Sequence, residues 1–299
     1  MRSKKLVSFE ELEKADVFDL PTRTLVEAFY KGTDALAEFA KSVMIPLLRG
    51  QINLGDKEKA IVGTYYRMYA WVRSMVAMNS RIHFQGAATA ARSLFELLLD
   101  IQTLATDKTG ASVERFHTFP EIERFRVADN LVSFCNDHRN NTRLDDSHQR
   151  AFMSKPGKRE SIDQTIVKLW GKTKKGKPNR LEHWTGKKIR ERAHDLGLKY
   201  DELYHESYPL LSWYIHSGST GYAGLSSETI EQCFGVSHSI AQKVFLEATV
   251  ICAQEMKISL ALDWFHKAIA ELRLTPGKVL VEEQIKILEE TKSKLGATK

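Results

Sequence analysis

The most constraining stretch of this sequence is 85–106, which has the composition of one helix with apolar residues on nearly every side. It begins with small residues, the alanines at 87, 88, 90 and 91, and continues with leucine, phenylalanine and isoleucine. A helix that is apolar all round has to be covered by other helices, so it lies in the middle of a bundle. No segment shows the alternating pattern of a strand. The sequence therefore predicts an all-α fold, a helical bundle with long core helices and peripheral short helices.

Other helices are expected on both sides of this stretch. One helix opens at Asp56 and runs to about residue 83. After the central stretch, we expect a short helix capped by Ser112 and a second one that starts at Pro120, since proline favours a first helical turn. Near the end, a short helix over 227–234 precedes the longest one, over 237–272. The chain is accordingly divided into an N-terminal helical extension packed on the core, the helical bundle core and a C-terminal amphipathic helix, at residues 1–55, 56–272 and 273–299.

Composition excludes several classes of protein. No run approaches 18 consecutive apolar residues, so no membrane span and no membrane partner are expected. No apolar segment follows the basic residues at the N-terminus, and we infer no signal peptide. Cys135, Cys233 and Cys252 are far apart, which favours free thiols in a reducing cytoplasm over a disulfide framework. No spacing typical of metal ligands or of a nucleotide loop is present, so no metal or cofactor is predicted.

The positive charge of the chain is concentrated in one segment. Residues 168–192 contain ten basic side chains against two acidic ones, whereas the net charge of the whole chain is +6. A solvated loop is one interpretation. The other is contact with the phosphates of RNA or another polyanion, with Trp170, His183 and Trp184 stacking on bases. The candidate nucleic-acid-binding residues are Lys172, Lys174, Lys175, Lys177, Arg180, Lys187 and Lys188.

A row of polar side chains marks the expected helix over 200–216. Tyr200, Tyr204, Tyr208, Ser212 and His216 recur every four residues, which places them along one slowly drifting row. The last residue stands at a helix C-terminus before a glycine-rich turn, where the helix dipole favours a protonated imidazole and contact with an anion. The alternative is an internal hydrogen-bond ladder between helices.

The central apolar helix carries one charged pair, Arg92 and Glu96, at i, i+4 spacing. Because alanine and leucine surround it in the sequence, we expect the pair to lie away from solvent. It either holds the polar row in place or forms part of a ligand site. We expect Arg92, Glu96, Tyr208, Ser212 and His216 to cluster in space as the candidate catalytic residues.

Three segments together resemble a bacterial family catalogued only as a domain of unknown function. They are R-S-L-F-E at 92–96, W-T-G-K-K-I-R-E-R-A-H-D-L-G at 184–197, and Y-x-x-x-Y-P-L-L-S-W-Y-I-H-S at 204–217. The resemblance covers roughly residues 61–262. It implies a helical fold and little biochemistry.

A more distant resemblance is to the higher-eukaryote-and-prokaryote nucleotide-binding (HEPN) helical bundles. It rests on Arg-x-x-x-Glu in an early helix and on a histidine that ends a late one. Those bundles include metal-independent ribonucleases and effectors of toxin or phage-defence systems. The resemblance implies that His216 acts as general base on a 2′-hydroxyl or as a phosphate contact, that Arg92 stabilises phosphate charge, and that Tyr208 and Ser212 orient them.

The sequence departs from the ribonuclease motif of that group, which is arginine, four to six residues, then histidine. Before His216, the corresponding positions hold Pro209, Leu210 and Leu211. The match at Arg143 and His148 falls in an expected loop and is of the kind that arises by chance.

Two functions therefore stay open. One is a HEPN-like protein that binds nucleic acid or nucleotide, in its sharpest form a metal-independent ribonuclease or effector in a bacterial defence or toxin system. The other is a non-catalytic helical sensor or scaffold that uses its helices to contact a protein partner or a second copy of itself.

Overall fold

The computed structural model describes residues 23–138, 142, 144–155, 157–179, 181–215, 226–258 and 267–268. The chain divides into two compact units. Unit 1 combines residues 1–105 with 196–299, and unit 2 is the continuous segment 106–195. This division was not predicted from the sequence.

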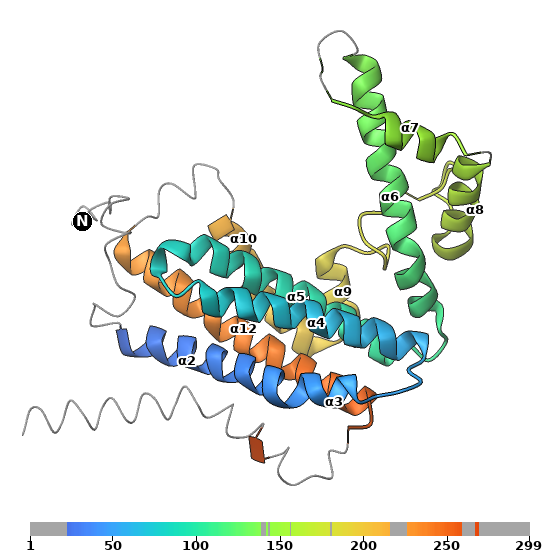
Figure 1. Cartoon of the computed structure of the whole chain (residues 1–299). Coiled ribbons are helices and arrows are strands. Elements are labelled where there is room, and N and C mark those ends of the chain that lie inside the picture. Colours follow the sequence, from blue (N-terminus) through green and yellow to red (C-terminus); the bar gives the residue numbers. More distant parts are fainter. Residues whose placement is uncertain are drawn as a thin grey trace, which may run out of the picture. The chain divides into compact units, whose positions relative to one another are not determined.

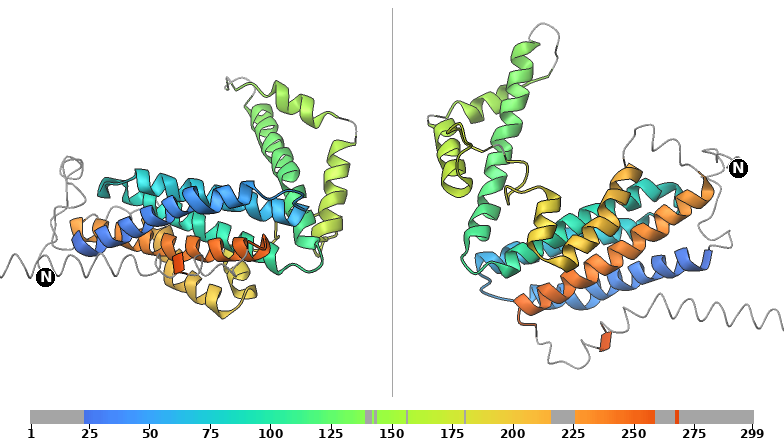
Figure 2. Two further views of the ribbon diagram at one scale, coloured as in Figure 1. Left: turned by 60° about the horizontal axis from the view of Figure 1, so that its bottom comes forward. Right: turned by 180° about the vertical axis from the view of Figure 1, so that it is seen from behind.

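Unit 1 is a bundle of long helices that lie alongside one another (Figures 1 and 2). Helix α2 packs against both α4 and α12, and α10 lies against α5 and α12. Two short helical turns, η1 and η2, precede α3 and α5. The bounds are α2 Arg23–Phe39, η1 Ala40–Met44, α3 Ile45–Arg49, α4 Asp56–Ala77, η2 Arg81–His83, α5 Phe84–Thr106, α10 Leu198–Ile215 and α12 Ser227–Glu255.

Helix α5 occupies the position that its composition predicts. Its four alanines at 87, 88, 90 and 91 have no exposed surface, and neither do Leu94 and Phe95. Between α4 and α12, the rings of Tyr65 and Phe245 stack at 5.2 Å, and the Tyr65 hydroxyl lies 3.1 Å from Thr249 Oγ1. The all-α bundle predicted from the sequence is confirmed.

Several helix boundaries that the sequence suggested are wrong. The segment around Pro120 is one helix, α6 (Ala111–Asp137), with the proline in its interior. One lost backbone hydrogen bond is tolerated there because α6 packs on both sides of it, through Phe116 against Trp184 and through Ile122 in the unit 2 core.

The break expected near residue 235 is absent too, and α12 runs without interruption from Ser227 to Glu255, ending well before residue 272. Gly235 lies inside this helix against α2, where an added Cβ would be 3.4 Å from Val26 Cγ2. Helix α4 likewise ends at Ala77, earlier than residue 83.

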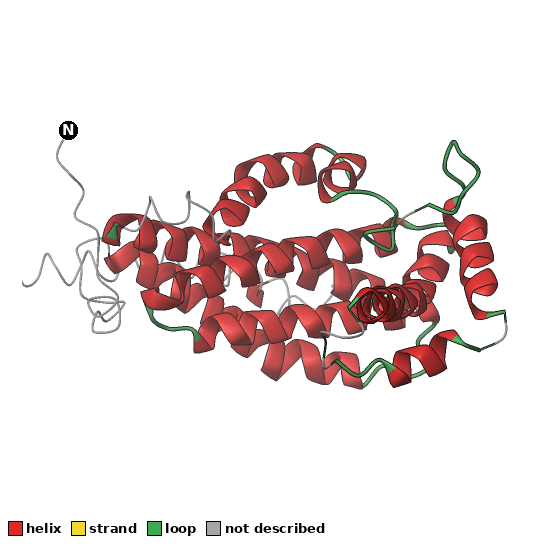
Figure 3. Cartoon of the chain, turned by 90° about the horizontal axis from the view of Figure 1, so that it is seen from above, coloured by secondary structure: helices red, strands yellow, loops and turns green. Residues whose placement is uncertain are grey.

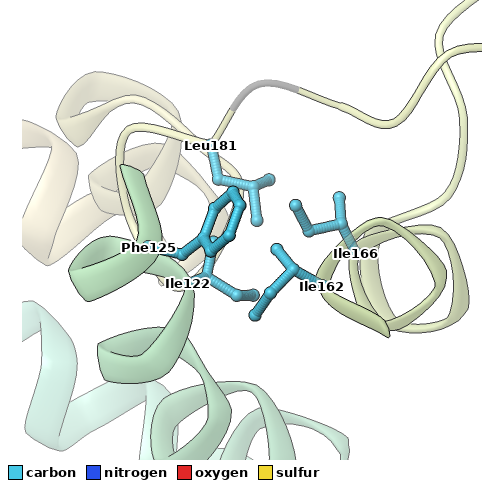
Figure 4. Close-up of a cluster of buried hydrophobic side chains, with 5 residues drawn as sticks. All are labelled: Ile122, Phe125, Ile162, Ile166 and Leu181. Carbon is cyan, nitrogen blue, oxygen red and sulfur yellow. The ribbon is translucent and has the colours of Figure 1, made fainter. Parts of the chain in front are cut away.

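Unit 2 is built on α6, with α7 (Ser147–Met153), α8 (Lys158–Trp170), the loop that follows α8, and α9 (Ile189–Asp195). Its core joins α6, α8 and that loop through side chains that point toward one another (Figure 4). They are Ile122, Phe125, Ile162, Ile166 and Leu181. The basic loop is thus anchored at Leu181.

Helices and loops account for the described part of the chain, which contains no strand (Figure 3). A single antiparallel bridge joins Lys172 and Pro178. None of the described helices combines the length and the apolar character needed to cross a bilayer. Within the same residues, no group of three or more His, Cys, Asp or Glu side chains is arranged to hold a metal ion.

Candidate functional site

Helices α5 and α10 bring three of the predicted residues into direct contact. The Tyr208 hydroxyl donates to Glu96 Oε1 at 2.7 Å. The Arg92 Nε–H points at both acceptors, with Tyr208 Oη at 2.8 Å and Glu96 Oε1 at 3.2 Å. We call this closed set of hydrogen bonds the Arg92–Glu96–Tyr208 triad.

Tyr208 is the buried member of the triad. Its ring lies 5.8 Å from that of Phe95 on α5 and is stacked at 5.3 Å on Tyr204, one turn earlier in α10. Burial, followed by the hydrogen bond to Glu96, raises the pKa of Tyr208 to about 12. The phenol therefore stays protonated near neutral pH, and it acts as a hydrogen-bond donor to Glu96 and not as a base.

Arg92 is held at one end and open at the other. Its guanidinium carbon lies 4.8 Å from the centroid of the Tyr208 ring, and its Nε is used within the triad. Its two terminal nitrogens bond to none of the described residues. The side chains of Arg92 and Glu96 are 31% and 39% exposed, so the expectation that this pair lies away from solvent is wrong.

The polar row of α10 does not act as one unit. Tyr200 turns away from the triad toward α12, where its hydroxyl lies 3.5 Å from Glu247 Oε1. Four residues make 400° of helix, so the row drifts by about 40° at each step, and Tyr200 and Tyr208 consequently face different neighbours. Ser212 lies one turn beyond the triad and forms no hydrogen bond with it. His216 lies outside the described residues.

The predicted nucleic-acid-binding segment of unit 2 forms a short hairpin at its tip, which we call the lysine hairpin (residues 172–178). Gly176 N–H donates to Thr173 O at 2.9 Å and Thr173 N–H to Lys177 O at 2.7 Å. Lys174 and Lys175 are the central residues of this turn. The exposed lysines at 172, 174, 175 and 177 form no ion pair with any described residue.

The ring of Trp184 is not available to stack on a base, contrary to the stacking interpretation for this residue. Trp184 is 5% exposed and packs edge-on against Phe116. The Trp170 Nε1–H donates to Trp184 O at 2.7 Å, and the Asn179 side chain donates to Trp170 O. Gly186 has a φ of +72° and leaves room for Trp170, because an added Cβ would lie 2.9 Å from Trp170 Cδ1. These contacts anchor the base of the hairpin.

The other predicted basic residues differ in their surroundings. Lys187 forms an ion pair with Asp195 at 2.5 Å. The side chain of Lys188 is exposed, and its backbone N–H donates to Glu191. Arg180 lies outside the described residues.

A model of a family of unknown function (DUF5677) matches residues 58–230, more than half of the 299-residue chain. This chain belongs to that family. The resemblance to a domain-of-unknown-function family that the sequence motifs indicated is thereby confirmed. No match was found among curated proteins or among solved structures.

The DUF5677 match includes all three members of the triad and the whole of unit 2. Within it, sequence reasoning did not assign a role to Phe95 or Tyr204, which hold the Tyr208 ring. A signal was available for both. Phe95 stands beside Glu96 in the R-S-L-F-E segment, and Tyr204 is one helical turn from Tyr208.

Proposed function

We propose that this DUF5677 protein binds RNA or a nucleotide, with Arg92 contacting a phosphate group. The observation that carries the proposal is the guanidinium itself, which is fixed at Nε by the triad while both terminal nitrogens are free of described partners. Arginine in this state matches two oxygens of a phosphate with two parallel N–H donors.

The triad also prepares Arg92 for that role. Glu96 balances its charge, and the Tyr208 ring lies against the guanidinium, so the side chain is ordered before a ligand arrives. A pre-ordered donor loses less conformational entropy on binding than a free surface arginine does. Partial exposure, 31% for the Arg92 side chain, leaves the ligand a path to it.

Replacing Arg92 with alanine is expected to weaken the binding of a mononucleotide such as AMP by about 10- to 100-fold, since a hydrogen bond to a charged group contributes roughly 1.5–3 kcal/mol. Arg92→Lys keeps the charge but loses the two-pronged geometry, and it should recover only part of the affinity. Isothermal titration calorimetry of the three proteins measures both effects.

The matched control is Arg73→Ala. Arg73 also pairs with a glutamate in unit 1, Glu38 at 2.9 Å, and its side chain is 43% exposed. Its removal should leave AMP affinity within about two-fold, less than half a kcal/mol. Equal losses in the Arg73 and Arg92 variants, or no loss in either, would count against the proposal.

The lysine hairpin of unit 2 is proposed as an RNA contact in its own right. Its four lysines are exposed and unpaired among the described residues, so they can neutralise phosphates without first breaking an ion pair. Changing Lys174, Lys175 and Lys177 together to glutamine should flatten the plot of log affinity against log salt by about 2 for a 20-nucleotide single strand, since each phosphate contributes about 0.7. Fluorescence anisotropy at several salt concentrations measures this slope.

A control with the same change in net charge is Lys31, Lys41 and Lys59 to glutamine. These three lysines of unit 1 already form ion pairs with acidic residues three or four positions earlier in the chain. The slope should stay at the wild-type value. If both triple variants flatten it equally, the contact is a property of net charge and not of the hairpin.

In its sharper form, the proposed function is metal-independent RNA cleavage, with His216 as general base and Arg92 stabilising the charge on phosphorus. The setting would be a cytoplasmic effector in bacterial defence or toxin action. The free, buried state of all three cysteines fits a reducing compartment. Incubation of labelled RNA with the protein in EDTA tests this form directly, and cleavage products are the expected result.

The second candidate is a non-catalytic helical sensor or scaffold. The observation that favours it is the closure of the triad, in which Tyr208 and Glu96 already satisfy one another. In that case Arg92→Ala lowers the stability of unit 1, whereas the wild-type protein binds no nucleotide in the calorimetric experiment.

A further inference from the structure

Unit 1 contains a cavity of about 470 Å³ in the groove between α10 and α12. Three leucines from three helices form its apolar surface, Leu98 of α5, Leu203 of α10 and Leu246 of α12. Small-molecule sites of proteins are typically clefts of this size, mostly apolar and with a few polar groups that orient the ligand. The cavity therefore has room for an organic molecule and an apolar surface to bind its body.

Two ion pairs cross the groove and frame the cavity. Lys199 of α10 lies 2.6 Å from Glu247 of α12, and Lys243 of α12 lies 3.4 Å from Glu206 of α10. The order of these residues shows that the two helices run antiparallel at this point. Both lysines already have a carboxylate partner, so neither is free to attract an anionic ligand.

One of the charged side chains that line the cavity forms no ion pair with a described residue. The lining has two lysines and three glutamates, a net charge of −1, and Glu202 is the carboxylate that pairs with no described residue. Tyr200 adds an aromatic ring to the same wall, with Lys199 Nζ 5.7 Å from the ring centroid. A carboxylate without an ion-pair partner is suited to an ammonium group through charge.

We propose that this cavity binds a small organic amine, with its apolar body on the three leucines and its ammonium group at Glu202. This site is separate from the phosphate contact proposed at Arg92. None of the three triad residues is among those that line the cavity. The inference stands whether or not Arg92 binds a nucleotide.

The preference for a positive charge is tested with three probes that share one aromatic body and differ in the head group. They are 2-phenylethylamine, 2-phenylethanol and phenylacetate. Titration calorimetry at pH 7 is expected to show the amine binding about ten-fold more tightly than the alcohol, a difference of about 1.4 kcal/mol. Phenylacetate should bind more weakly than either, because it meets an unpaired carboxylate. Equal or tighter binding of phenylacetate overturns the proposal. So does the absence of amine binding at about 10 mM amine, which is ten-fold above a Kd of about 1 mM.

Two variants tie the binding to this cavity. Leu203→Trp fills it from a partly exposed position and should abolish binding of both the amine and the alcohol. Glu202→Gln leaves the apolar surface intact and should reduce amine affinity to that of the alcohol, while alcohol affinity stays the same. Glu38→Gln, on α2, is the control for a lost surface carboxylate and should change neither affinity. Unchanged amine binding in both cavity variants would show that the amine binds elsewhere.

Discussion

Arg81→Met is expected to lower the free energy of unfolding of unit 1 by about 3–5 kcal/mol. Arg81 Nη1 lies 2.7 Å from Glu231 Oε1, and the two side chains are only 10% and 6% exposed. The pair links η2 to α12 across 150 positions of the sequence. Removing Arg81 takes the ion-pair partner away from a buried carboxylate, and the desolvation of that carboxylate is the source of the large cost.

Removing both charges should cost much less, so the double variant Arg81→Met, Glu231→Leu is expected to recover most of the lost stability. Amide hydrogen exchange in α5 and α12 reports on unit 1 alone, because both helices belong to it. The exposed pair Arg73–Glu38 gives the comparison, and Arg73→Ala should cost less than about 1 kcal/mol. A similarly small cost for Arg81→Met would show that the buried ion pair contributes no more to stability than a solvent-exposed pair does.

The second large effect concerns His238, which has no exposed surface and whose pKa is lowered to about 3 by burial. The Thr33 hydroxyl donates to Phe29 O, so its oxygen accepts from the His238 Nδ1–H at 2.9 Å. The ring is therefore the neutral tautomer with a bare Nε2, and that atom has no hydrogen-bond partner among the described residues. A proton added at Nε2 would be buried without an acceptor.

The lowered pKa of His238 makes the stability of unit 1 depend on pH. Above a pH of about 6.5 the residue is neutral in both the folded and unfolded chains and has no effect. Between about 6.5 and 3 the unfolded chain binds the proton while the folded chain does not, so unfolding becomes easier by up to about 1.4 kcal/mol per pH unit. From pH 7 to pH 4.5, we expect His238 to destabilise unit 1 by roughly 2–3 kcal/mol.

His238→Gln tests this expectation, since glutamine can keep an N–H donor near Thr33 but does not titrate in this range. Urea unfolding at pH 7.0 and pH 4.5 measures the stability that is lost between these two pH values. This loss should be smaller in the variant than in the wild type by roughly 2–3 kcal/mol. His205→Gln is the control, because His205 is on the surface of α10 with its side chain 54% exposed. Identical pH profiles for His238→Gln and the wild type would contradict the assignment of a buried neutral imidazole.

The helical architecture was predictable because its signals are local. Apolar residues on every side of 85–106 required a central helix, and burial of its alanines bears this out. The wrong helix boundaries arose where tertiary packing overrides a local sequence signal. Pro120 and Gly235 both favour a helix end in the sequence, yet each lies inside a helix held by contacts with other parts of its own unit.

The candidate site was predictable in part for the same reason. Two charged residues in an apolar helix and a row of tyrosines pointed to Arg92, Glu96 and Tyr208, which do meet. Contacts between distant segments leave no such pattern. Nothing near Arg81 indicates Glu231, and the cavity depends on how α10 crosses α12, which periodicity does not specify.

The division of unit 1 into two stretches of sequence has a consequence for biosynthesis. Unit 2 is continuous and can fold as soon as residue 195 has left the ribosome. The bundle cannot close at that time, because α2 and α4 pack on α12, which ends at Glu255. At about 5–20 residues per second, α5 waits roughly 7–30 s for that helix after its own synthesis. During this interval α5, the most apolar of the described helices, lacks the cover that α12 provides.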